Sequence, residues 1–271
     1  MIREPAVAGQ FYSFDGENLE KELKKAFSLS GEPKASKNAN KILAAICPHA
    51  GYMYSGSIAA YSYKALKEDR TPKTVVIIGP NHGGMGPAVS VYPNGEWETP
   101  LGKVEVDSEL AEKIAGGKFS LDEDAHIYEH SIEVQLPFLQ HVYKEFKIVP
   151  ICVMAQRLNL MEELGQRLSE VVKDGAVIAS TDFSHYVPYQ EAYDRDFKAI
   201  NAIKNLDEVG LFDAVEKYGI SMCGSGPVAA AIVYSKLKGA KEGKLLKYTT
   251  SGDVTGDKGA VVGYASLVLT K

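Results

Sequence analysis

The chain has 271 residues, a formal net charge of -5 at pH 7 and 45% hydrophobic residues. This composition supports a sizeable core and lacks the basic excess of nucleic-acid-binding proteins, so we expect no nucleic-acid partner. No apolar run is long enough to span a membrane and no signal-peptide core is present, which predicts a cytoplasmic protein without a membrane association. Three widely separated Cys indicate reduced thiols and no disulfide framework.

The first third of the chain predicts two core strands joined by a helix. Residues 18–27 carry apolar side chains at helical spacing, and the polar stretch 28–41 is typical of a surface loop. The apolar runs 42–47 and 74–79 are predicted core strands, and a helix is expected at 56–67 between them. This order indicates a strand, helix, strand unit of the parallel kind.

The middle of the chain predicts an antiparallel insertion. Short strands are expected at 88–92 and 102–106, around a turn signal at 93–95. A helical pattern then runs from 131 to 143, where Pro137 should start a new turn or kink the helix.

The remaining sequence alternates strands with helices again. The clearest helix is expected at 159–174, with Asn159 as its N-cap and Gly175 at its end. The other predicted elements are strands at 147–154 and 176–180, helices at 190–203, 207–218 and 227–237, and β segments at 245–251 and 260–269. We therefore predict an α/β fold, a single three-layer αβα domain over residues 1–271 with a mixed central sheet.

Three of the six His follow directly after predicted core strands. They are His49, His82 and His185. A lone His after a strand is more often a loop residue hydrogen-bonded to nearby backbone. Open α/β sheets, however, bind ligands at the carboxyl ends of their strands, and His is the commonest metal ligand and the usual acid or base near neutral pH. Three His in one topological position therefore favour a functional site.

Cys223 is a second candidate, because it lies just before the helix expected at 227–237. The positive end of a helix dipole and free backbone N–H groups lower the pKa of a thiol, which would make Cys223 a metal ligand or a nucleophile. We expect it to be exposed and rich in thiolate. Cys47 and Cys152 lie inside apolar strands and are expected to be small buried hydrophobic residues.

The other polar candidates have both functional and structural interpretations. His130 and Glu133 are three residues apart and could share a helix face toward the pocket, although by themselves they would suggest a solvated ion pair. His126 is expected on a surface loop and His141 on a helix surface. Tyr54 could bind substrate or only pack. The glycines at 83, 84 and 86 fit no Walker or dinucleotide pattern, so no nucleotide cofactor is expected.

Five ordered motifs resemble those of the Memo family, which is structurally related to the class III extradiol ring-cleaving dioxygenases. The motifs are Pro48-His49-Ala50-Gly51-Tyr52, Gly79-Pro80-Asn81-His82, Glu129-His130-Ser131-Ile132-Glu133, Ser180-Thr181-Asp182-Phe183-Ser184-His185 and Cys223-Gly224. With Ala8-Gly9-Gln10-Phe11-Tyr12 near the N-terminus, the resemblance covers nearly the whole chain.

The resemblance implies a metal-binding pocket and a role for several of its residues. His49, His82 and Cys223 would occupy the positions where the dioxygenases hold non-haem iron with two His and a Glu. Asp182 and His185 would line the pocket, with His185 as acid or base. Cys223 is also a candidate catalytic residue, and Phe11, Tyr54 and His130 are expected to contact substrate.

The motifs identify the family, but they do not identify its activity. A eukaryotic relative is described both as an adaptor that docks phosphotyrosine peptides and as a copper-dependent redox enzyme, and Phe11 stands where its docking groove has a Trp. A thiolate is softer than a carboxylate and favours Zn, Cu(I) or thiolate-bound iron, so ring cleavage does not follow from the fold.

We therefore expect an enzyme dependent on iron, copper or zinc. An oxidoreductase is favoured over a hydrolase, and the substrate is an unknown small molecule or peptide. The alternative is a binding protein whose pocket captures an acidic or phosphorylated group, and homo-oligomers are compatible with either function.

Overall fold

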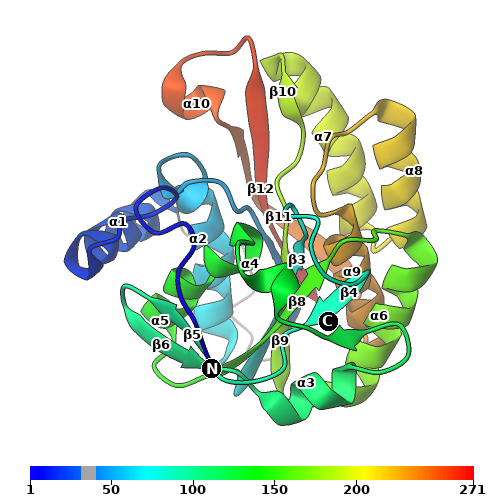
Figure 1. The fold of residues 1–271 in the computed structure, drawn as a ribbon. Coiled ribbons are helices and arrows are strands. Elements are labelled where there is room, and N and C mark those ends of the chain that lie inside the picture. The colour runs from blue at the N-terminus through cyan, green and yellow to red at the C-terminus, as the bar shows by residue number, and fades with distance from the viewer. Residues whose placement is uncertain (32–40) are drawn as a thin grey trace.

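The structure, a computed structural model, describes residues 1–31 and 41–271, and a mixed sheet of nine strands runs through its centre (Figure 1). Four parallel strands form the middle of the sheet, in the order β2 (Ile42–Cys47), β9 (Gly175–Ser180), β3 (Thr74–Pro80) and β8 (Lys147–Val153). Antiparallel strands flank them, with β12 (Val261–Thr270) beside β2 and β4 (Val89–Val91) beside β8. The predicted α/β class and mixed sheet are confirmed.

Shorter or outer strands complete this sheet. Both β10 (His185–Val187) and β11 (Glu242–Thr250) pair antiparallel with β12, and β7 (Ser120–Leu121) pairs with β4. The β10 pairing matters for the site, because it fixes His185 on β12, which in turn pairs with β2, the strand that His49 follows. The carboxyl ends of β2, β9 and β3 lie next to one another at this edge of the sheet.

Helices cover both faces of the sheet because its central strands are apolar on both sides. In β3, Val76 and Ile78 face one core while Val75 and Ile77 face the other, and all four side chains are fully buried. This alternation is the period-2 geometry of a strand. Continuous apolar runs are typical of parallel strands covered on two faces.

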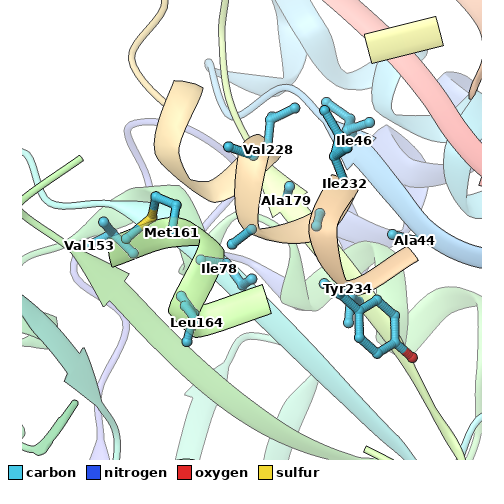
Figure 2. Close-up of a cluster of buried hydrophobic side chains, with 14 of the residues drawn as sticks. Ala44, Ile46, Ile78, Val153, Met161, Leu164, Ala179, Val228, Ile232 and Tyr234 are labelled. Atoms are coloured by element: carbon cyan, nitrogen blue, oxygen red, sulfur yellow. The ribbon is translucent and has the colours of Figure 1, made fainter. Parts of the chain in front are cut away.

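Each face has its own group of helices (Figure 1). On one face lie α6 (Leu158–Val171), α7 (Tyr189–Lys204), α8 (Glu208–Tyr218) and α9 (Ser225–Leu237), and on the other lie α1 (Gly16–Leu29), α2 (Tyr52–Asp69) and α5 (Leu136–Val142). Figure 2 shows the first core, where Val228 and Ile232 of α9 pack with Ile46 of β2. Each fully buried side chain of this size contributes about 1.5–3 kcal/mol to folding.

Helices α2 and α6 differ from their predicted boundaries. Helix α2 begins at Tyr52, four residues before the predicted 56, so Tyr54 lies in its first turn and not in a loop. Helix α6 begins at Leu158 with Arg157 as N-cap, so Asn159 is not the cap. Gly175 opens strand β9 and does not end the helix, whose last residue is Val171.

The predicted antiparallel insertion is present, but the two strands expected around the turn at 93–95 do not pair with each other. Strand β4 joins the central sheet, while β5 (Glu96–Thr99) pairs with β6 (Gly102–Glu105) and with β1 (Ile2–Arg3) in a separate three-stranded sheet. The hairpin turn therefore follows Thr99 instead of spanning 93–95. Apolar alternation marks both strands, but it does not determine which strand becomes the partner.

Shorter helices complete the fold. They are α3 (Ser108–Ile114), a 3₁₀ turn at Asp124–His126, α4 (His130–Glu133) and α10 (Gly252–Thr255). The helical pattern of 131–143 divides into α4 and α5, with Pro137 in the first turn of α5, as predicted. Most of the surface loop expected at 28–41 lies outside the described residues. Within the described ranges, no helix is both long and apolar enough to cross a membrane.

Candidate metal centre

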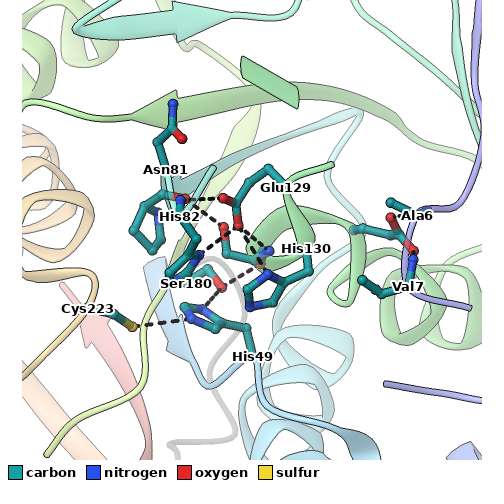
Figure 3. A network of polar contacts seen from close by, with 12 residues as sticks. Ala6, Val7, His49, Asn81, His82, Glu129, His130, Ser180 and Cys223 are labelled. Atoms are coloured by element: carbon teal, nitrogen blue, oxygen red, sulfur yellow. Dashed lines mark hydrogen bonds and ion pairs between the residues drawn. The ribbon is translucent and has the colours of Figure 1, made fainter. Parts of the chain in front are cut away.

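The three predicted metal ligands converge at the carboxyl edge of the sheet. His49 follows β2, His82 follows β3, and Cys223 lies two residues before α9. Their ligand atoms all lie within 4.8 Å of one another, and Sγ of Cys223 lies 3.2 Å from Nε2 of His49. Figure 3 shows Cys223 beside the His49 ring. The predicted convergence is confirmed, and these residues could hold one metal ion.

Hydrogen bonds to Ser180 determine which nitrogen of His49 is free. The Ser180 hydroxyl donates its proton to the carbonyl of Ser131 at 2.6 Å, so it can only accept from Nδ1 of His49, 2.8 Å away. Nδ1 therefore carries the proton and Nε2 keeps its lone pair on the side of Cys223. Burial, and then the neighbouring His130 and His82, lower the pKa of His49 well below its usual value, which favours the neutral form that binds metals.

Glu129 likewise determines which nitrogen of His82 is free, although its hydrogen bond and charge raise the pKa of His82 against the effect of burial. Its Oε1 accepts from Nδ1 of His82 at 2.9 Å, and its Oε2 accepts from the His82 backbone N–H at 2.6 Å. Burial alone would raise the pKa of Glu129, but hydrogen bonds from His82 and Ser131 lower it to about 2, so the carboxylate is ionised. Both imidazoles thus leave Nε2 free for the site, and the Glu129–His82 pair is the arrangement of a carboxylate-supported metal ligand.

Cys223 completes the donor set but differs from the prediction in its protonation. Burial, and then the nearby Asp182 carboxylate, raise the pKa of this thiol, so it is not rich in thiolate in the metal-free protein. The Asp182 backbone N–H donates to Sγ at 3.1 Å. Cys223 is half-buried, whereas Cys47 and Cys152 are fully buried, as expected. Two imidazoles and a thiol, which bind a metal in their deprotonated forms, fit a soft or borderline ion.

The structure places Asp182 and His185 in the same pocket, as expected, but each is hydrogen-bonded to another residue. Oδ1 of Asp182 accepts from the His49 backbone N–H at 2.9 Å, and burial raises the pKa of Asp182 to about 7. The His185 ring contacts the Ser221 carbonyl through Nδ1 at 2.8 Å. Ser221, and not Asp182, therefore orients the His185 ring. His185 is not in either described group of residues with converging ligand atoms.

A pocket of about 620 Å³ opens over this cluster. The predicted substrate-contact residues Phe11, Tyr54 and His130 all line it. The His130 ring packs between Phe11, at 4.7 Å, and His82, at 4.6 Å between ring centroids. His82, Glu129 and His130 form a second group with converging ligand atoms. Because the first two are hydrogen-bonded to each other, we interpret that group as support for the first.

Glu133 and His126 are both buried and have structural roles. Glu133 was interpreted either as a pocket residue on one face with His130 or as part of a solvated ion pair. It is fully buried, forms an ion pair with Arg3 and accepts from the Tyr12 hydroxyl at 2.6 Å. It anchors the N-terminal segment that carries Phe11 to the pocket. His126, expected on the surface, is also fully buried and stacks edge-on against Trp97. His141 is partly buried against Phe27.

Sequence reasoning assigned no role to several residues that shape the site. Ser180 and Glu129 both lie inside the Memo-like motifs. Ser180 is the last residue of a predicted core strand and Glu129 directly precedes His130, so their positions in the sequence could have indicated a role in the site. Tyr186 and Tyr264 also line the pocket. Their local sequence does not indicate a role in the site. Tyr264 belongs to β12 and Tyr186 is placed by the pairing of β10 with β12, which the sequence does not reveal.

The fold and the site together define an α/β protein with a candidate metal centre of two His and one Cys at the carboxyl edge of a mixed sheet. The chain belongs to the Memo-like protein family, whose family model matches residues 3–268. It is 49% identical to a MEMO1 family protein of Methanopyrus kandleri, over 100% of both chains. It is 46% identical to one of Methanothermobacter thermautotrophicus, over 98% of this chain and 100% of the relative.

A solved structure resembles the fold at low sequence identity. The crystal structure of an uncharacterized protein from Escherichia coli K12 matches with a TM-score of 0.55 and 13% identity, over 84% of this chain and 99% of that one. This likeness concerns the fold alone.

Proposed function

We propose that this protein is a metal-dependent enzyme, an oxidoreductase acting on a small molecule that enters the pocket beside His49 and His82. The observation that carries the proposal is the convergence of His49, His82 and Cys223 within 4.8 Å under an open pocket. Three protein ligands leave a coordination position for substrate, which is the pattern of catalytic sites and not of closed structural ones.

The donor set favours redox chemistry at a thiolate-bound metal. Iron, copper or zinc fits two imidazoles and a thiolate; bound iron or copper would supply electron transfer, and zinc would only polarise a substrate oxygen. The extradiol dioxygenases that the family resembles use a carboxylate where this chain has Cys223. We therefore propose oxidation or reduction of the substrate without assigning ring cleavage.

Two side chains that are not ligands are proposed to handle the substrate and its proton. With Nδ1 of His185 donating to the Ser221 carbonyl, Nε2 is the nitrogen available to accept a proton. The Asp182 carboxylate, held by the His49 backbone N–H, is a hydrogen-bond acceptor in the pocket wall. In this proposal, His185 takes or gives the proton and Asp182 orients the substrate.

The alternative, capture of an acidic or phosphorylated group, has weaker support. The described residues that line the pocket include no Lys or Arg, while Asp182 and Asp257 contribute carboxylates. Recognition of phosphate and carboxylate groups normally uses Arg or Lys. The four His that line the pocket are better suited to a metal and to proton transfer.

The decisive experiment is elemental analysis of the purified protein beside two variants. We expect about one ion per chain in the wild type, near-complete loss in Cys223→Ala, and retention in Cys152→Ala, because Cys152 is a buried thiol outside the site. A metal content that is equal in wild type and Cys223→Ala would contradict the proposed ligand set. Absence of turnover in a redox screen of the loaded protein would favour the binding alternative.

A further inference from the structure

Tyr186 has a backbone conformation that a large side chain rarely adopts. Its φ is 56°, in the left-handed region, which bulky residues seldom enter and which costs conformational energy. The cause is a bulge in the pairing of β10 with β12, where His185 faces Val262 and Val187 faces Val261. Tyr186 is the extra residue between these two pairs. Bulges next to sites are a means of redirecting a side chain.

The Tyr186 side chain contributes little to the fold that would offset this cost. It is 78% exposed, and its hydroxyl has no hydrogen-bond partner in the part of the chain that the structure describes. The comparison is Leu206, the other described non-glycine residue with positive φ, which is 7% exposed and packs in the main core. Strain at Leu206 is offset by burial, whereas strain at Tyr186 is not.

The Tyr186 ring lies at the pocket over the metal centre. Tyr186 lines the pocket with Tyr54 and Tyr264, and its ring centroid lies 6.0 Å from that of His185. Burial, and then the proximity of Asp182, Tyr54 and Tyr186, raise the pKa of Tyr264, which indicates that the three hydroxyls share one region. Phe11 adds an aromatic ring to the lining, against His130.

We propose that Tyr186 is a specificity-determining residue whose ring packs over a planar, unsaturated part of the substrate while the polar end of that substrate reaches the metal centre. This inference rests on the proposed function, since it requires a ligand in the pocket. An exposed aromatic ring held at a pocket mouth offers a large contact area with few rotatable bonds to immobilise. The substrate class is therefore a flat, conjugated small molecule with oxygen or nitrogen donors at one end.

Two hydroxamates test the inference, because they share one metal-binding group and differ only in a ring. Zinc-loaded full-length protein is titrated calorimetrically with benzohydroxamate and acetohydroxamate. In the wild type, we expect benzohydroxamate to bind more tightly. In Tyr186→Gly that preference should fall by about 3- to 10-fold, the usual range for one aromatic contact. Affinity for acetohydroxamate and zinc content should stay unchanged.

The variants separate the ring from the fold. Tyr186→Gly should not unfold the chain, because glycine adopts a φ of 56° without strain. Tyr186→Phe keeps the ring and should keep the preference. An unchanged preference for benzohydroxamate in Tyr186→Gly would overturn this inference but not the proposed function. If light scattering also showed a different molecular mass for Tyr186→Gly, the ring would be assigned to contacts between copies of the chain. Failure of both hydroxamates to bind the wild type would overturn the proposed function and the inference together.

Discussion

Glu129 and His82 form a hydrogen-bonded pair between residues 47 positions apart, with Oε1 of Glu129 at 2.9 Å from Nδ1 of His82. The same carboxylate also accepts from the backbone N–H groups of His82 and Ser131. One side chain therefore determines both the tautomer of the His82 ring and the path of its backbone.

Replacing Glu129 by Gln should weaken metal binding although no ligand is changed. Both carboxylate oxygens accept hydrogen bonds from N–H groups of His82. The NH₂ group of a Gln would replace one of these acceptors by a donor, so one hydrogen bond to His82 would be lost. We expect the affinity for Zn²⁺ to fall by about 10- to 100-fold. Competition with a chromogenic chelator measures it, and Glu163→Gln at a surface ion pair is the control. Unchanged affinity would show that Glu129 does not support the ligand.

Alkylation should single out Cys223 among the three thiols. In metal-free native protein, iodoacetamide should modify Cys223, because Cys47 and Cys152 are fully buried. The reaction should be slower than that of a free cysteine, since burial raises the pKa of Cys223. Zn²⁺ should protect the thiol, as followed by mass spectrometry. Equal labelling of all three before denaturation would contradict the structure.

His185→Ala should separate catalysis from metal binding. We expect most of the metal affinity to remain, while any turnover found in a redox screen falls by about 10²- to 10⁴-fold through loss of the acid or base. His141→Ala, on the α5 helix, is the control. If His185→Ala empties the site as completely as His49→Ala does, His185 belongs with the ligands.

His126 should make stability depend on pH. Burial lowers its pKa from 6.5 to about 4, so the unfolded chain binds the proton more strongly than the folded one. The contribution of His126 to the free energy of unfolding is complete above pH 6.5. It is lost as the pH falls toward 4, by about 3 kcal/mol in total. Urea unfolding of wild type and His126→Phe between pH 7 and 4.5 measures this. The variant should lose less stability, and parallel curves would refute the assignment.

One substitution should have opposite effects at two helical glycines. In Gly165→Ala, the new Cβ of α6 would lie 2.6 Å from Cβ of Val233 and 2.7 Å from the Ala230 carbonyl oxygen of α9. We expect a loss of about 1–3 kcal/mol from overpacking. In Gly56→Ala of α2, the nearest atom is Cβ of Tyr52 at 3.4 Å, so helix propensity should leave stability equal or higher by up to about 1 kcal/mol. Chemical denaturation gives both values. Destabilisation of both variants alike would contradict the close packing of α6 on α9.

The sequence by itself determined the central strands and the ligands at their ends. Apolar runs such as 74–79 specify buried strands because side chains alternate between two covered faces, and parallel strands end at one edge of the sheet. His49 and His82 could thus be placed together without coordinates. The prediction for Cys223 also required the family motifs, because a residue before a helix has no fixed position relative to a strand.

Only the tertiary structure decided what surrounds those ligands. The protonation of Cys223 depends on its burial beside Asp182, the role of Glu129 on a contact with a distant loop, and the bulge at Tyr186 on its pairing with β12. Glu133 and His126 appear solvated in their local sequence and are buried by segments near the N-terminus and by β5. Local periodicity carries information about a residue's own helix or strand, whereas burial, pKa and hydrogen-bond partners arise from segments far apart in the chain.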